Sequence, residues 1–413
     1  MTRAVTPRTA PIRTTTVRLT LPVATLLLGA LPLAAQQYSF GPANADFKPG
    51  FEGQTRAAAP MDDTQVAPVA ETVVDGLVHP WGIAVLPDDS YLVTERAGRL
   101  RRITAEGDLS EPITGVPEVV AEGQGGMLDV ALAPDFAESR VVYLTYAKPM
   151  GDGLSATAAA RAVLSEDMTS LTELTDIFVQ DPPSPTTKHY GSRIVPDGDH
   201  VWITTGEHSS MAERDNAQQL DMSYGKVIRV TPEGDAPDDN PFVSDEAAID
   251  TIYTLGHRNI QGAALDPETG KLWTLEHGPK GGDELNLIEP GLNYGWPVVS
   301  YGIRYSGDPV GSGKARAEGF AEPRYYWDPV IAPGGFTFYE GDMFAGWEGD
   351  VIAASLNPGG LVRLQMEGTN VTGEARYLGD LGRVRDIEIA PDGAILALTD
   401  KENGALIRIT PEG

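Results

Sequence analysis

Short apolar runs separated by polar turns recur along the chain from about residue 80 to its end. Each copy reads as an apolar strand, a turn built on Pro-Asp, Asp-Gly or Glu-Thr-Gly, and a second apolar strand. These turn residues favour tight hairpins, and the β-branched and aromatic residues on the flanks suit a pleated sheet. The copies occupy residues 82–95, 129–147, 192–207, 262–277 and 386–400, with a degenerate one at 336–356.

The spacing of these hairpins is typical of a propeller. Successive turns lie about 47 to 75 residues apart, at Pro87, Pro134, Pro196, Pro267, Asp342 and Pro391. Propeller blades run about 40–50 residues, so the longer intervals leave room for loops. We therefore predict an all-β fold, a six-bladed β-propeller over residues 67–413. A pair of β-sandwiches is the alternative, but it does not explain one recurring hairpin. Helical periodicity is scarce, and 211–222 is at best a short helical stretch.

The first 35 residues predict an export signal. Arginines without any acidic residue accompany an apolar run from Leu19 to Ala35, and the small Ala34 and Ala35 favour cleavage near Ala35. A retained membrane anchor is the alternative, but the run is short for a spanning helix and contains prolines. We expect a periplasmic or secreted protein with no integral membrane segment after cleavage. Residues 36–66 lack periodicity and read as an N-terminal arm or linker.

Net charge and the absence of cysteine exclude several classes of function. The formal net charge is −28, and removal of the leader would take away four arginines and make it −32. Such a surface repels nucleic acid and attracts cations, so we expect no nucleic-acid partner. The chain has no cysteine, which excludes thiolate chemistry and cysteine-bound zinc. An exported chain without disulfides must be held by its core or by metal ions.

Polar residues in the connections between predicted blades are the first candidates for a site, because loops at one channel mouth would bring them together. His189 precedes a strand in TTKHYGSR, and Glu207 ends the next strand, where it can orient an imidazole. Gln124 lies among glycines that let a ligand approach the backbone closely. Taken singly, a surface histidine, a solvated strand end and a flexible turn remain the commoner interpretations.

Two other connections carry arginines. Arg258 and Asn259 are adjacent in LGHRNIQG, where a surface arginine is the default interpretation. Arg383 and Arg385 are two residues apart at a strand entry, so both side chains point to one face of a regular strand. Like charges on one face make sense mainly over an anion, although two solvated arginines at a sheet edge remain an equal alternative.

The segment 275–297 has the composition of a cation site. Asp283 and Glu284 stand among glycines, and carboxylates beside exposed carbonyls suit Ca²⁺, which takes about six to eight oxygen ligands. The acids do not have the spacing of an EF-hand loop.

Together these segments resemble the soluble aldose sugar dehydrogenases of the glucose/sorbosone dehydrogenase family, which depend on pyrroloquinoline quinone (PQQ). The resemblance covers residues 75–410 and is carried by HPWGIAVLPD, GQGGMLDVALAPDF, KHYGSR, GKVIRVTPEGDAPDDNPF, LGHRNIQG, EHGPKGGDELNLI, NYGWP and GRVRDIEIAPDG. It implies a six-bladed propeller with PQQ and calcium at a channel mouth. The implied reaction oxidises an aldose at the anomeric carbon to a lactone, with an external quinone, dye or cytochrome as electron acceptor.

The resemblance also implies roles for individual residues. His189 would take the proton of the anomeric hydroxyl while a hydride passes to the quinone, and Glu207 stands where well-known members have an aspartate. The implied catalytic set is His189, Gln124, Glu207 and Arg258. The implied cofactor-binding set is Arg258, Asn259, Arg383, Arg385, Gln124 and Asn357. The implied calcium ligands are the carbonyls of Gly278 and Pro279 at the cofactor, and Glu284 with the neighbourhood of Tyr294 at a second, structural ion.

One position departs from the family pattern. Asn357, in ASLNPGG, stands where family members commonly have a lysine that contacts PQQ. Either the affinity for PQQ is lower or another group compensates. Two other functions stay open: a calcium-dependent propeller lactonase or hydrolase, which would need several carboxylates around a channel ion, and a sugar-binding propeller with a vestigial site.

Overall fold

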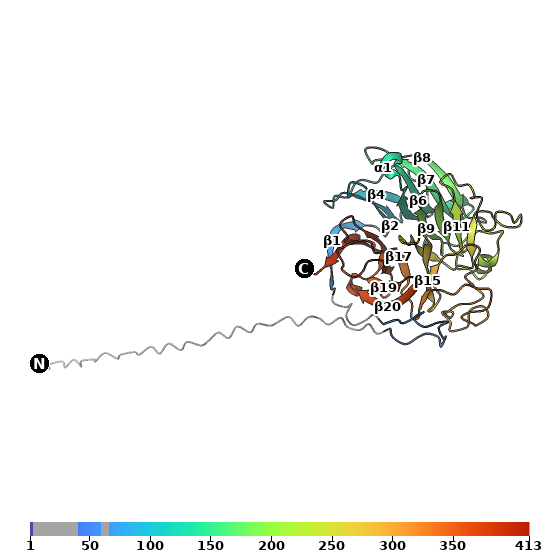
Figure 1. Ribbon diagram of the computed structural model, residues 1–413. Helices are drawn as coiled ribbons and strands as arrows, with labels where there is room; N and C mark the ends of the chain where they lie inside the picture. Colours follow the sequence, from blue (N-terminus) through green and yellow to red (C-terminus); the bar gives the residue numbers. More distant parts are fainter. Residues whose placement is uncertain (3–39, 59–65, 413) are drawn as a thin grey trace. The chain divides into compact units, whose positions relative to one another are not determined.

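The computed structural model describes residues 1–2, 40–58 and 66–412. The chain divides into two units, Met1–Ala34 and Ala35–Gly413. The predicted export signal, 1–35, lies outside the described residues except for Met1 and Thr2. The described part of the second unit consists of six small antiparallel sheets, so the predicted six-bladed β-propeller is confirmed (Figure 1).

Six inner strands form the wall of the central channel. They are β2 (Pro80–Val85), β5 (Met127–Leu132), β9 (Gly191–Pro196), β13 (Ile260–Leu265), β17 (Pro333–Phe338) and β21 (Val384–Ile389). Each inner strand contacts the next, and β21 contacts β2, which closes the ring. Every one of them is the first strand of a hairpin predicted from the sequence.

The outer strands follow each inner strand in chain order. Blades one to three add β3 (Tyr91–Glu95) and β4 (Arg99–Ile103); β6 (Val141–Gly151), β7 (Leu154–Leu164) and β8 (Leu171–Val179); and β10 (Val201–Thr205), β11 (Lys226–Val230) and β12 (Ile252–Leu255). Blades four and five add β14 (Leu272–Glu276), β15 (Asp283–Leu287) and β16 (Tyr325–Trp327); and β18 (Val351–Ser355), β19 (Leu361–Glu367) and β20 (Asn370–Tyr377). The helical segments in the described residues are α1 (Phe136–Ser139) and the 3₁₀ helices η2 (Arg214–Gln218) and η3 (Gly379–Leu381). The η2 helix lies in the stretch 211–222.

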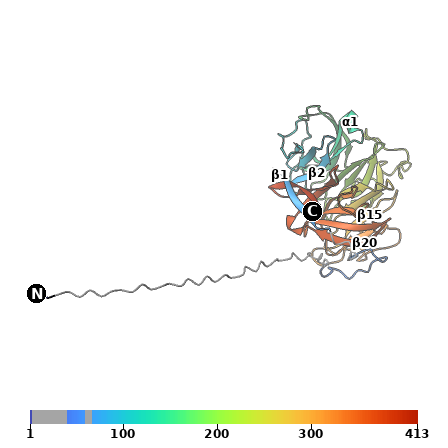
Figure 2. The same cartoon turned by 60° about the vertical axis from the view of Figure 1, so that its left-hand side comes forward.

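The sixth blade is shared between the two ends of the propeller. Its strands β22 (Ile395–Thr399) and β23 (Gly404–Pro411) follow β21, and its outermost strand is β1 (Pro68–Leu77). β1 pairs antiparallel with β23 from Pro68↔Pro411 to Leu77↔Gly404, and Figure 2 shows β1 beside the C-terminal end. This pairing ties the first strand of the ring to the last and protects a sheet edge.

The turn residues close the hairpins as their chemistry predicts. Between β13 and β14, Thr269 Oγ1 donates to Asp266 Oδ2 at 2.6 Å, and the Asp266 amide donates to the Lys271 carbonyl. Between β21 and β22, Gly393 has a φ of 87°, which residues with a side chain rarely adopt. Both turns come from the Glu-Thr-Gly and Asp-Gly elements that predicted hairpins.

Apolar cores between neighbouring blades hold the ring together. One cluster joins Trp273 of β14 to Phe336 and Phe338 of β17, and the ring centroids of Trp273 and Phe338 are 6.1 Å apart. Burial of one such phenylalanine side chain is worth about 1.5–3 kcal/mol. The cores fix the blades against each other, and the inner strands carry this rigidity to the channel mouth.

Residues 40–58 pack along the outer edges of blades four and five. The Tyr326 amide of β16 donates to the Gln54 carbonyl, and the Glu374 amide of β20 donates to the Ala57 carbonyl. The Asn44 amide donates to Asp328 Oδ2 at 2.9 Å. The described part of the predicted arm, 36–66, therefore covers two outermost strands that would otherwise expose unpaired backbone groups.

Candidate active site

A pocket of about 260 Å³ opens at one mouth of the channel. Apart from Tyr305, which lies in the connection between β15 and β16, its lining residues lie where inner strands begin or where the following strand ends, so all six blades contribute. Arg96, His277, Leu356 and Asp400 directly follow the second strand of their hairpins, β3, β14, β18 and β22. The strand geometry therefore delivers residues far apart in the sequence to one polar site.

His189 and Glu207 form a buried hydrogen-bonded pair at this pocket. His189 Nδ1 lies 2.9 Å from Glu207 Oε1, and the two residues are 7% and 1% exposed. Glu207 Oε2 accepts from the Ser209 amide at 2.8 Å, which fixes the carboxylate. Burial raises the pKa of Glu207 to about 7, against the pull of Arg258. Burial, and then Arg258 and Lys188, lower the pKa of His189 well below its ordinary value, so the imidazole is neutral at neutral pH.

Gln124 orients the loop that carries the histidine. The side-chain Oε1 of Gln124 accepts from the backbone amide of His189 at 2.8 Å, and the backbone amide of Gln124 donates to the Thr187 carbonyl. Gln124 and His189 both line the pocket. The predicted association of Gln124, His189 and Glu207 at one site is thus present in the structure.

Four arginines give the pocket wall its charge. Arg96, Arg258, Arg383 and Arg385 line the pocket together with one carboxylate, that of Asp400. The wall therefore has a formal excess of three positive charges. Such a concave wall, with low-dielectric protein behind it, attracts anions even on an acidic protein.

Arg385 of β21 and Arg383, just before this strand, face an anion of the chain itself. Arg383 Nη2 and Arg385 Nη2 lie 2.8 and 2.7 Å from the same oxygen, Asp400 Oδ2. Burial alone would raise the pKa of Asp400, but Arg385, Arg383 and a hydrogen bond with His79 outweigh it and lower the pKa. The like charges at this strand entry are thus partly neutralised by the chain.

Asn259 presents a donor to the pocket. Its Oδ1 accepts from the Gly191 amide at 3.0 Å, which leaves the side-chain NH₂ to donate. Arg258 is fixed beside it, because its Nη1 donates to the His277 carbonyl at 2.9 Å and its guanidinium lies over the ring of Trp296. These contacts aim a cation and an amide donor at the same cavity.

The acidic segment after β14 is used in two ways. Asp283 accepts three backbone hydrogen bonds, from Gly278, Ile331 and Ala332, so it holds the loop and is not a free ligand. Glu284 points elsewhere, into a cavity of about 10 Å³ that is also lined by Glu276 and Tyr294. Burial, and then the charge of Glu276, raise the pKa of Glu284 well above its ordinary value.

Only some of the predicted calcium ligands line these two cavities. Gly278 lines both cavities, and Pro279 follows it outside the lining. The hydroxyl of Tyr294 donates to the Leu287 carbonyl and accepts from the Glu289 amide. Tyr294 could therefore bind an ion only through its backbone carbonyl. Within the described ranges, no three His, Cys, Asp or Glu side chains are grouped to hold a metal ion.

Asn357 stays at the edge of the site. It is exposed, and the preceding Leu356 lines the pocket instead. Besides Leu356, sequence reasoning missed seven other lining residues: Trp81, Arg96, Gln261, His277, Tyr305, Ala332 and Asp400. The register of the repeat could have indicated three of them, because Arg96, His277 and Asp400 directly follow the second strand of a hairpin, much as Glu207 follows β10.

The structure thus combines a closed six-bladed propeller with a histidine held by a carboxylate and an arginine-lined pocket at the channel mouth. The chain belongs to the Glucose / Sorbosone dehydrogenase family, whose model matches residues 77–408. The family resemblance seen in the sequence motifs is thereby confirmed.

Known relatives cover nearly the whole propeller. The chain is 41% identical over 345 residues to the aldose sugar dehydrogenase YliI of Escherichia coli (strain K12), covering 83% of this chain and 92% of the relative. The crystal structure of the soluble E. coli aldose sugar dehydrogenase in the apo-form matches with a TM-score of 0.80 at 39% identity, covering 84% and 100% of the two chains. The PQQ-bound form of an aldose sugar dehydrogenase from Streptomyces coelicolor matches with a TM-score of 0.68 at 28% identity, covering 83% and 98%.

Among the described residues, none forms a helix that is long and apolar enough to cross a membrane.

Proposed function

We propose that this protein is a PQQ-dependent aldose sugar dehydrogenase that oxidises the anomeric carbon of sugars to the lactone. The observation that carries the proposal is the His189–Glu207 pair facing a pocket walled by four arginines. The relatives named aldose sugar dehydrogenase support the substrate class, and the PQQ-bound relative supports the cofactor. The export leader expected from the sequence favours action in the periplasm or outside the cell.

The residues present fit PQQ, which carries three carboxylates. The wall has three positive charges in excess, and Arg258 and Arg385 are nearly buried, where charged hydrogen bonds are worth about 1.5–3 kcal/mol each. The Nε atoms of these two arginines are buried without a hydrogen-bond partner among the described residues, which marks donor capacity not used by the protein. Asn259 adds a neutral donor for a quinone oxygen.

The chain's own residues account for the proton transfer. When bound, PQQ would supply the quinone that accepts the two electrons of the sugar. Neutral His189 donates its Nδ1–H to Glu207, which leaves the Nε2 lone pair free to take the proton of the anomeric hydroxyl. The imidazolium that forms is stabilised by the carboxylate behind it, and Gln124 holds the backbone of the loop.

Calcium is proposed at two places. The loop carbonyls of Gly278 and Pro279 would hold one ion beside the cofactor, where it would act as a Lewis acid. Glu284, Glu276 and the Tyr294 backbone would hold a second ion in the small cavity, which is about the size of one water molecule. Burial, and then repulsion from Glu276, raise the pKa of Glu284, and a cation there would offset both effects.

The hydrolase alternative is less well supported. It needs several carboxylates around an ion in the channel. Three carboxylates line the channel cavity, those of Asp129, Asp386 and Glu388, and the first two flank the guanidinium of Arg193 instead. It also gives no use to the arginine wall.

One assay tests the proposed function. Purified apo-protein is titrated with PQQ in calcium, and dye reduction is then followed with glucose and other aldoses. Saturable PQQ binding and aldose-dependent dye reduction are expected. Lactone hydrolysis without PQQ would favour the hydrolase, and sugar binding without turnover would favour the vestigial site.

A further inference from the structure

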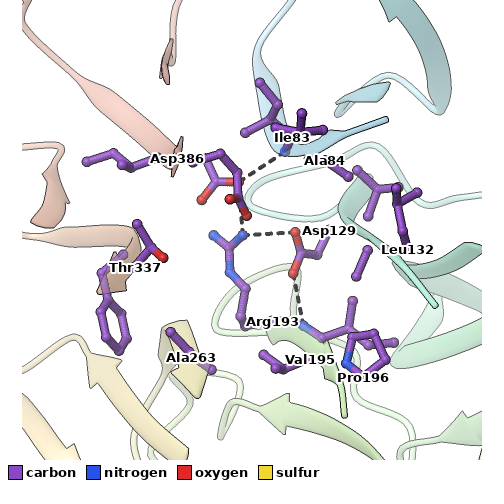
Figure 3. Close-up of a pocket in the computed structure, with 18 of the residues that line it drawn as sticks. Ile83, Ala84, Asp129, Leu132, Arg193, Val195, Pro196, Ala263, Thr337 and Asp386 are labelled. Atoms are coloured by element: carbon purple, nitrogen blue, oxygen red, sulfur yellow. Dashed lines mark hydrogen bonds and ion pairs between the residues drawn. The ribbon is translucent and has the colours of Figure 1, made fainter. Parts of the chain in front are cut away.

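A buried ion cluster lies in the central channel next to the pocket. Arg193 of β9 places Nη1 2.8 Å from Asp129 Oδ1 and 3.0 Å from Asp386 Oδ2, so the guanidinium stands between two carboxylates (Figure 3). The carboxylates also accept backbone amides, from Ile194 at 2.9 Å and Ile83 at 3.0 Å. All three charged residues are at most 7% exposed, so water and salt screen the cluster little.

The backbone of the inner strands is shaped to admit this cluster. A Cβ atom added at Gly335 of β17 would lie 1.7 Å from Asp386 Oδ1, and one at Gly82 of β2 would lie 2.6 Å from Asp129 Oδ1. A side chain at either position would displace a carboxylate. The residues that form the cluster and make room for it therefore come from β2, β5, β9, β17 and β21.

Gln261 of β13 connects the cluster to the pocket wall. Its backbone carbonyl accepts from Arg193 Nε at 3.2 Å and Nη2 at 3.1 Å. Its side-chain Oε1 accepts from Arg385 Nη1 at 2.8 Å and lies 2.9 Å from His277 Nε2. One residue thus joins the channel arginine to two groups that line the pocket.

Trp81 makes a second connection. The guanidinium carbon of Arg193 lies 4.6 Å from the centroid of the Trp81 ring, and that of Arg385 lies 5.8 Å from it. Trp81 lines the pocket, whereas Arg193 lines the channel cavity of about 350 Å³. Trp81 and Gln261 therefore form the floor between the two cavities, and Arg193 supports both from the channel side.

We propose that Arg193 is a positioning residue for the cofactor pocket, which rests on the proposed function above. The carboxylates of Asp129 and Asp386 hold the Arg193 guanidinium, which in turn fixes Trp81 and Gln261. Through these two residues, Arg193 sets the orientation of the Arg385 and His277 side chains. Arginine suits this role because its planar fork reaches the carboxylates with one nitrogen and the Gln261 carbonyl with the other two. Lysine has a single ammonium group and cannot make both sets of contacts in the same geometry.

The chain contains a matched control for the chemistry of this cluster. Arg363 of β19 is 1% exposed, its Nε donates to Asp350 Oδ2 at 2.6 Å, and its guanidinium lies 4.6 Å from the centroid of the Trp347 ring. None of these three residues lines the pocket. Arg193→Lys and Arg363→Lys therefore remove the same kind of contact, with and without a link to the pocket floor.

The experiment compares PQQ binding by apo-protein of the wild type, Arg193→Lys and Arg363→Lys, with thermal melting to confirm folding. We expect Arg193→Lys to raise the Kd for PQQ at least about tenfold, the loss typical of one misplaced charge-assisted hydrogen bond. At saturating PQQ, we expect kcat to fall with a smaller change in the sugar KM, because the floor orients the cofactor. Arg363→Lys should lower the melting temperature and leave the Kd within about twofold.

The outcomes separate the two proposals. An Arg193→Lys variant that is folded and binds PQQ like the wild type overturns the positioning role while the proposed function stands. An equal loss of affinity in Arg363→Lys overturns it too, because the effect would then be general destabilisation. A wild type that binds no PQQ overturns both. If Arg193→Lys does not fold, Asp129→Asn weakens the same clamp more gently and must raise the Kd in the same direction.

Discussion

His189 Nδ1 and Glu207 Oε1 are 2.9 Å apart, and neither side chain has appreciable contact with water. Burial works in opposite directions on the two groups, lowering the pKa of the imidazole and raising that of the carboxyl to about 7. A histidine buried in this way stays unprotonated at neutral pH, as a general base must. In the proposed function, the carboxylate would keep Nδ1 as the donor and leave Nε2 for the substrate.

Replacing His189 with alanine should abolish most of the sugar oxidation. A proton-transfer group contributes about 10²–10⁴-fold, so kcat should fall by roughly that factor. PQQ titration of the apo-protein should give a nearly unchanged Kd, because His189 carries no charge toward the cofactor. Near-full turnover in the variant would show that another group is the base.

The pH profile should report Glu207. As the pH falls below about 7, this carboxyl takes up a proton and no longer holds Nδ1–H as a charged acceptor, so kcat should decline toward acid with a midpoint near pH 7. Glu207→Gln cannot ionise. It should lower kcat toward the smaller end of the about 10²–10⁴-fold range and remove this acid limb. Glu207→Asp, the control, keeps a carboxylate and should keep the limb. The same acid limb in Glu207→Gln would assign the titration to another group.

The fold could be predicted from sequence because each hairpin is a local event. The Pro-Asp and Asp-Gly turns and their alternating flanks specify two strands within about 15 residues, so six copies predict six blades. The strand pairing that closes the ring could not be predicted in this way. β1 and β23 pair across more than 300 residues, and neither strand belongs to a hairpin phrase.

The site was predictable where a residue is unusual in its own segment, as His189 is in KHYGSR. A site residue could not be recognised where its role depends only on its position in the folded ring. Asp400 looks like a solvated strand end, yet it is the carboxylate that Arg383 and Arg385 share. Two arginines on one strand face suit an anion, and one such anion is part of the chain, 15 residues beyond Arg385. Trp81 lies within the motif HPWGIAVLPD, and its place in the floor follows only from its contact with Arg193.

Arg385→Ala should weaken PQQ binding more than Arg383→Ala. Arg385 is 7% exposed and bonded to Gln261, whereas the Arg383 side chain is 50% exposed. Charged hydrogen bonds are worth about 1.5–3 kcal/mol, which converts to about tenfold to hundredfold in Kd, with the exposed arginine nearer the lower value. Added salt should reduce the contribution of Arg383 more, since exposed charges are screened. PQQ titrations at low and moderate salt make the comparison, and a larger effect of Arg383→Ala would reverse the assignment.

Calcium removal should lower both activity and the melting temperature. An ion bound only by the folded chain stabilises it by mass action, and the cavity beside Glu284 and Glu276 is the expected structural site. The melting temperature should drop when a chelator replaces excess calcium. Glu284→Gln should remove most of that difference, whereas Glu233→Gln, at an exposed turn, should not. Identical melting temperatures of the wild type in chelator and in calcium would contradict a structural ion at Glu284.

Asn357→Lys should tighten PQQ binding by restoring the cation that family members commonly have. Asn357 is exposed and directly follows Leu356, which lines the pocket. A lysine at this position would therefore have a flexible side chain beside the pocket mouth, and its ammonium group would lose little hydration. A partly screened charged hydrogen bond of about 1.5 kcal/mol corresponds to about tenfold in Kd. The titration is done on apo-protein in calcium at moderate salt, so that the protein's net charge of −28 does not mask the effect.

The neutral variant Asn357→Gln lengthens the side chain without charge and separates contact from electrostatics. A gain for lysine alone indicates that the wall still lacks a cation for the third carboxylate of PQQ. No gain for lysine, together with a loss in Arg385→Ala, would mean that Arg96 already takes the place of the family lysine, because Arg96 lines the same pocket. If Asn357→Lys and Arg385→Ala both bind PQQ like the wild type, the cofactor does not lie against β21 and the PQQ assignment is wrong.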